Sequence, residues 1–126
     1  MQNILALAAR VLLAILFIVA GFGKLTGFAG TVGYFGSIGL PVPTVTAAIV
    51  TALELLGGIA ILAGFFSRPV ALALAAFSIA SGFIGHFQPD DQMQMISFMK
   101  NLGLAGGFLM IAAFGPGAYS VDARRA

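Results

Sequence analysis

Four long apolar stretches divide the chain, and its polar residues gather at their ends and in the connections between them. The stretches cover residues 4–23, 44–64, 69–87 and 96–114. A helix of about 20 residues rises about 30 Å, which is the thickness of the hydrocarbon core of a bilayer. The pattern therefore predicts an all-α membrane bundle, a single domain of four spanning helices that run up, down, up and down.

The connection between the first two stretches is longer than the others and interrupts the apolar pattern. Residues 26–43 contain five Gly, two Pro and Tyr34. Within this connection, residues 29–38 could form a short interfacial helix or a re-entrant turn, but they are too few to span a bilayer. Pro41 and Pro43 should end the element, because each proline pushes the preceding residue out of helical conformation.

Composition supports a membrane protein and excludes several other classes. The chain is 60% hydrophobic and 8% charged, whereas about a quarter of the residues of a soluble domain are charged. Its basic residues are scattered, so nucleic-acid binding is not predicted. With no cysteine and one histidine, His86, the chain has too few ligands for an iron–sulfur, zinc or two-histidine haem site. No intrinsic cofactor or metal is therefore expected.

The distribution of cations predicts the orientation in the membrane. Four spans put both termini on one side, and that side carries Arg10, Arg68, Arg124 and Arg125. The opposite side carries Lys24 and Lys100, beside Asp90 and Asp91. Cytoplasmic loops are enriched in Lys and Arg. Both termini are therefore predicted to lie in the cytoplasm.

Glu54 is the residue most relevant to function, because it lies at the middle of the second apolar stretch. A carboxylate at the centre of a bilayer costs roughly 2.5–3.5 kcal/mol and is expected to have a partner inside the protein. Two interpretations stay open. Glu54 forms a structural ion pair with Lys24, Arg10 or Lys100, or it is a proton-accepting or ligand-binding carboxylate.

Arg10 and Lys24 mark the two ends of one helix face, which also includes Ala14, Phe17 and Gly21 at spacings of four and three. The two cations can extend to opposite membrane interfaces. Alternatively, they flank a cavity that attracts a carbonyl-bearing head group, such as that of a quinone.

Polar residues at one end of the predicted bundle suggest where such a cavity lies. Lys24, His86, Lys100 and Asn101 all fall on the side opposite the termini. They could rim a pocket with Glu54 deeper inside, or they could be separate interfacial residues. His86 could be solvated, or it could relay protons or contact a quinone.

Small residues predict where helices pack closely, because glycine lets two helix backbones approach each other in a membrane. The glycines expected at such contacts are Gly21, Gly57, Gly58, Gly82, Gly103 and Gly107.

Taken together, these motifs resemble the DoxX family of small four-helix bacterial membrane proteins. The matching features, in order, are R-x13-K (Arg10, Lys24), G-L-P (Gly39 to Pro41), E-L-L-G-G (Glu54 to Gly58), S-R (Ser67, Arg68), His86 and K-N (Lys100, Asn101). The resemblance covers about residues 7–122.

The resemblance implies a location in the bacterial cytoplasmic membrane and an association with quinone and redox metabolism. The function expected from it is that of a membrane subunit or accessory factor in quinone-linked redox metabolism or in oxidative or quinone stress resistance. A protein partner or a homo-oligomer is expected, since the chain has no evident redox centre of its own and is not predicted to catalyse alone. Two alternatives remain: a small proton-coupled carrier gated by Glu54 and Lys24, and an assembly protein that docks a partner through its glycine-rich faces.

Overall fold

The computed structural model describes residues 1–125, and all regular structure in that range is helical. The six helices are α1 (Gln2–Thr26), α2 (Phe28–Ser37), α3 (Pro43–Ala63), α4 (Ser67–His86), α5 (Gln92–Phe114) and α6 (Val121–Arg125). α1, α3, α4 and α5 are long and apolar enough to cross a membrane. This confirms the four-helix membrane bundle, and the short element between the first two spans is the helix α2.

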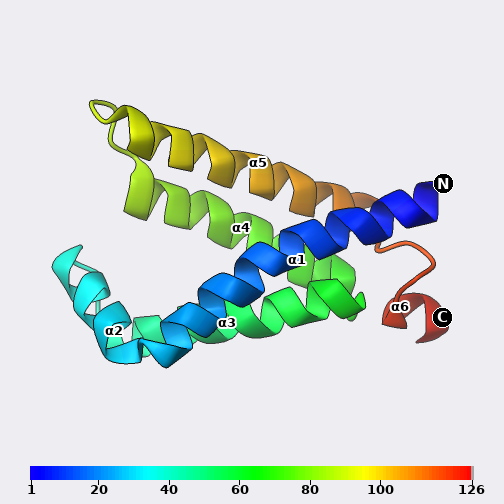
Figure 1. Cartoon of the computed structure of the whole chain (residues 1–126), viewed down its shortest axis with the longest axis horizontal. Coiled ribbons are helices and arrows are strands. Elements are labelled where there is room, and N and C mark those ends of the chain that lie inside the picture. Colours follow the sequence, from blue (N-terminus) through cyan, green and yellow to red (C-terminus); the bar gives the residue numbers. More distant parts are fainter. Residues whose placement is uncertain (126) are drawn as a thin grey trace.

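The four spanning helices form two pairs (Figure 1). α1 packs along α3, and α4 packs along α5, while the contacts between the two pairs are fewer. The pairs lie close together at the end that holds both termini and diverge toward the end that holds α2 and the connection between α4 and α5. This divergence leaves room between the pairs at one end of the bundle.

Close backbone contact holds α1 against α3. A Cβ atom at Gly21 would lie 2.7 Å from the backbone nitrogen of Leu55, and one at Gly58 would lie 2.9 Å from the side chain of Ile18. Only glycine permits this approach without displacing a neighbour. The predicted face of α1 is also confirmed, because Arg10, Ala14, Phe17 and Gly21 are its buried residues.

The other expected glycine contacts differ from one another. Gly57 faces Leu74, Gly82 faces the Cβ atom of Asn101, and Gly107 faces Leu13, with each would-be Cβ at 3.2–3.4 Å from its neighbour. Gly103 has nothing within 4 Å. It therefore does not pack against another helix within residues 1–125, which corrects the expectation for this position inside the bundle.

The spanning helices begin and end at residues that sequence periodicity placed only approximately. α5 begins at Gln92, before the apolar stretch, because the Asp91 carboxylate accepts hydrogen bonds from the amides of Met93 and Gln94. α4 begins at Ser67, preceded by Phe66 in left-handed conformation. Ser67 is the first helical residue.

The C-terminal tail packs against the turn between α3 and α4. The Asp122 carboxylate accepts hydrogen bonds of 2.8 Å from the backbone amides of Phe66 and Ser67. A carboxylate from the tail thus satisfies amides at the start of α4, where an N-cap side chain would ordinarily bind. The tail is therefore an integral part of this end of the bundle.

Candidate functional site

A cavity of about 420 Å³ lies between the two helix pairs, at the end where they diverge. Its wall is mostly apolar and includes Phe17, Phe35, Phe77 and Leu104. The polar or ionisable residues in the wall are Lys24, Tyr34, Thr46, Glu54, Ser78, Ser81, His86 and Asn101. A largely apolar cavity with a few convergent polar groups is the usual form of a small-molecule site, and this volume lies in the usual range.

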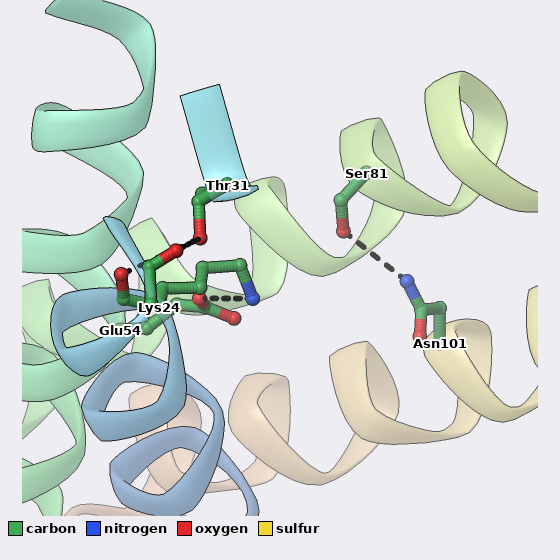
Figure 2. Close-up of polar contacts among 6 residues, drawn as sticks. Lys24, Thr31, Glu54, Ser81 and Asn101 are labelled. Carbon is green, nitrogen blue, oxygen red and sulfur yellow. Dashed lines mark hydrogen bonds and ion pairs between the residues drawn. The ribbon is translucent and has the colours of Figure 1, made fainter. Parts of the chain in front are cut away.

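Lys24 and Glu54 form an ion pair in this wall, with Lys24 Nζ 2.8 Å from Glu54 Oε1 (Figure 2). The Glu54 side chain is 8% exposed and the Lys24 side chain 28% exposed. Of the three cations considered as partners for Glu54, the structure places Lys24 beside it. Lys24 therefore turns inward along α1 and does not extend to the interface.

Within residues 1–125, this ion pair is the only polar interaction that the Glu54 side chain makes. The second carboxylate oxygen and the remaining protons of the Lys24 ammonium are not used in hydrogen bonds between side chains. The pair therefore offers one acceptor and at least one donor at the cavity wall.

A second polar group lies on the other helix pair, where α4 meets α5. The Asn101 side-chain amide donates to the carbonyl oxygen of Ser78 at 3.0 Å and to Ser81 Oγ at 3.2 Å. Figure 2 shows the Ser81–Asn101 contact apart from the Lys24–Glu54 pair. The Ser81 hydroxyl donates in turn to the Ser78 carbonyl at 3.3 Å. Ser78 is 1% exposed, and its own hydroxyl has no hydrogen-bond partner among residues 1–125.

His86 is the last residue of α4 and lines the cavity. Its Nδ1 lies 2.8 Å from Gln94 Oε1. Because an amide oxygen can only accept, Nδ1 carries the proton in this contact, and the neutral ring keeps Nε2 as an acceptor. His86 is therefore not simply a solvated interfacial residue, since Gln94 orients its ring.

Two of the residues predicted for the site lie outside it. Arg10 is fully buried at the opposite end of α1, where it donates to the backbone carbonyls of Ile61 and Leu62 at 3.2 and 3.1 Å and to that of Tyr119. It neither extends to the interface nor flanks the cavity. Lys100 is exposed and is not part of the cavity wall.

Sequence reasoning did not assign a site role to Ser78, Ser81 or Tyr34. The two serines were interpreted only as small residues that let helices pack. Their one available signal was their spacing of three on the same face of α4, with Gly82 and Gly85 alongside. Their hydrogen-bonding role depends on Asn101, which comes from another helix.

Metal binding finds no support in the geometry of the described part of the chain. No group of three or more His, Asp or Glu side chains lies close enough to hold a metal ion within residues 1–125.

Comparison with known proteins places the chain in a family. A sequence profile of the DoxX family matches residues 5–87, which include the helix pair α1 and α3, α2 and almost all the cavity residues of α4. The chain belongs to the DoxX family. No solved structure shows a significant match.

Three relatives match nearly the whole chain. It is 45% identical over 122 residues to inner membrane protein YqjF of Escherichia coli, covering 97% of this chain and 92% of the relative. It is 41% identical over 128 residues to inner membrane protein YphA of the same organism, covering 98% and 91%. It is 32% identical over 117 residues to a Bacillus subtilis protein named "Putative oxidoreductase CatD", covering 86% and 84%. The similarity to these relatives thus extends beyond the region that the profile covers.

Proposed function

We propose that this DoxX-family protein binds the head group of a quinone in the cavity between the α1–α3 and α4–α5 pairs, and that it serves quinone-linked redox metabolism or quinone stress resistance. The observation that supports this most directly is the Lys24–Glu54 ion pair in the wall of an otherwise apolar 420 Å³ cavity. The name of the Bacillus subtilis relative, "Putative oxidoreductase CatD", also supports redox chemistry.

The residues present fit such a head group. A quinone ring is flat and apolar and carries carbonyl oxygens, which need hydrogen-bond donors. Phe17, Phe35 and Phe77 supply apolar wall, and the Lys24 ammonium supplies a donor. The Ser78 hydroxyl, which no residue of the described range 1–125 uses, is a further donor.

Lys24, Glu54 and His86 each have a specific role in this proposal. Lys24 donates to a ring oxygen, and Glu54 holds the Lys24 ammonium in place and accepts a proton from a ring hydroxyl. His86 exchanges protons between the cavity mouth and water through its Nε2 atom. When bound, the quinone supplies two-electron redox capacity.

A partner protein accepts the electrons as the ring loses its protons in this proposal, because the chain has no cysteine and one histidine with which to hold a redox centre of its own. We place the protein in the bacterial inner membrane, because its relatives YqjF and YphA are named inner membrane proteins. We place both of its termini in the cytoplasm. The termini lie at the same end of the bundle in Figure 1, as this orientation requires.

The test is native mass spectrometry of the protein extracted gently from its own membrane, followed by solvent extraction and quinone analysis. We expect quinone to co-purify with the wild-type protein. We expect most or all of this quinone to be absent from Glu54→Gln. Asp90→Asn is the matched control, because it makes the same charge change in an exposed loop outside the cavity. If Glu54→Gln retains as much quinone as Asp90→Asn, the proposed site is wrong.

A further inference from the structure

Polar residues from both helix pairs line the cavity. Lys24 and Glu54, on α1 and α3, form one polar group of the wall, which we call the Lys24–Glu54 pole. Ser78 and Asn101, on α4 and α5, form the second, which we call the Ser78–Asn101 pole. Aromatic and aliphatic side chains line the space between them. A ligand that fills this space therefore meets polar groups at two separate edges.

The Ser78 hydroxyl is the unexplained group at the second pole. A buried hydroxyl is almost always hydrogen-bonded, and in a helix it can rotate toward the carbonyl four residues earlier. Ser78 is 1% exposed and its hydroxyl makes no hydrogen bond within residues 1–125, although the residue forms part of the cavity wall. Leaving a buried polar group unpaired costs roughly 1–3 kcal/mol, so an occupant of the cavity is its natural partner.

Asn101 is fixed beside it in one orientation. Both protons of its amide nitrogen are used, one by the Ser78 carbonyl and one by Ser81 Oγ. Its amide oxygen takes no hydrogen bond within the described residues. The Ser78–Asn101 pole thus presents one free donor and one free acceptor, as the Lys24–Glu54 pole also does.

We propose that the Ser78–Asn101 pole binds the far edge of the ligand, so that the cavity selects flat rings carrying an oxygen at both of two opposite edges. This rests on the proposed function and deepens it. Because each pole offers both a donor and an acceptor, the cavity accommodates a ring with two carbonyls as well as a ring with two hydroxyls. One pole alone would not distinguish such a ring from a simple phenol.

The experiment compares two probes that differ in one oxygen. Durohydroquinone carries a hydroxyl at both ends of a fully methylated ring, and tetramethylphenol carries one at a single end. Binding is measured under argon as partitioning into nanodiscs that contain the protein, relative to empty nanodiscs of the same lipid. We expect the wild-type protein to bind durohydroquinone about three- to tenfold more tightly than tetramethylphenol, as one additional hydrogen bond allows.

Ser78→Ala should remove this preference by weakening durohydroquinone and leaving tetramethylphenol unchanged. Its thermal unfolding midpoint should be equal to or higher than that of the wild type, because the substitution removes an unpaired buried hydroxyl. Ser97→Ala, on α5 and outside the cavity wall, is the matched control and should change neither measurement.

The possible results separate this inference from the proposed function. If Ser78→Ala keeps the full preference, or weakens both probes equally, or lowers the unfolding midpoint, Ser78 does not bind the far edge and the inference is overturned. The proposed function survives that result as long as Glu54→Gln weakens both probes. If neither probe nor duroquinone binds the wild type above the level of empty nanodiscs, the proposed function fails, and the inference fails with it.

Discussion

At the end of the bundle that holds both termini, Arg10 is fully enclosed and donates to three backbone carbonyls. At the other end of the same face of α1, Lys24 is partly exposed at a cavity and pairs with one carboxylate. The two cations are 14 positions apart along α1. One end of this face is closed by protein groups, and the other leaves polar groups free.

The difference follows from what each cation meets. Ile61 and Leu62 lie in the last turn of α3, where backbone carbonyls have no partner within the helix and carry partial negative charge. The planar guanidinium of Arg10 can serve several such fixed acceptors at once. Lys24 meets a single side-chain carboxylate, and its compact ammonium has donors left over. A cation in a membrane helix is thus structural or available to a ligand according to how many acceptors surround it.

The largest effect should come from removing the cation at the closed end. Arg10→Met leaves the carbonyls of Ile61, Leu62 and Tyr119 without their donor, and we expect a loss of about 3 kcal/mol of stability. Lys24→Met should cost less, about 1–2 kcal/mol, because it leaves one side-chain carboxylate without a partner, whereas Arg10→Met leaves three backbone carbonyls. Reversible unfolding in mixed micelles measures both. Equal losses would contradict the contrast between the two ends.

A smaller effect is expected from adding a methyl group at the closed end. Gly64 ends α3 with φ of +72°, and a Cβ there would collide with Ser120 and with the Arg10 guanidinium. Gly64→Ala should therefore cost about 2 kcal/mol. Gly103→Ala is the matched control on an open face, where the better helix propensity of alanine predicts no loss or a gain of about 0.5 kcal/mol. A neutral Gly64→Ala would show that the tail does not pack tightly against this turn.

The smallest effect concerns pH at the closed end. Burial opposes the charge on Asp122, but hydrogen bonds from Ser67 and Phe66 and the charge of Arg125 outweigh it, so the pKa of Asp122 lies below its ordinary value of 3.8. The contribution of Asp122 to stability is therefore complete above pH 3.8 and is lost as the pH falls through the lower pKa of the folded state.

The proton chemical shifts of the Phe66 and Ser67 amides should follow this titration, because both amides bind the carboxylate. In Asp122→Asn the two shifts should not titrate in this range. A midpoint at or above 3.8 in the wild type would mean that the tail does not hold this position in solution.

Much of the architecture could be predicted from the sequence because it depends on local periodicity. The length of each apolar stretch identified four spanning helices, and spacings of three and four identified the buried faces of α1 and α3, including Glu54. The pattern of motifs also identified the family. The helix ends were predicted less accurately. The start of α5 depends on the Asp91 side chain, and the start of α4 depends on Asp122, which lies 55 positions after Ser67.

The pairing of the polar residues was decided by tertiary structure alone. The sequence placed Arg10, Lys24 and Lys100 equally well as partners of Glu54, and only the approach of α1 to α3 at Gly21 put Lys24 beside it. The role of Ser78 depends on Asn101, which comes from another helix and donates to the Ser78 carbonyl, while the Ser78 hydroxyl has no partner within residues 1–125. Periodicity determines which face a side chain lies on, whereas its partner depends on which helix packs there and at what height.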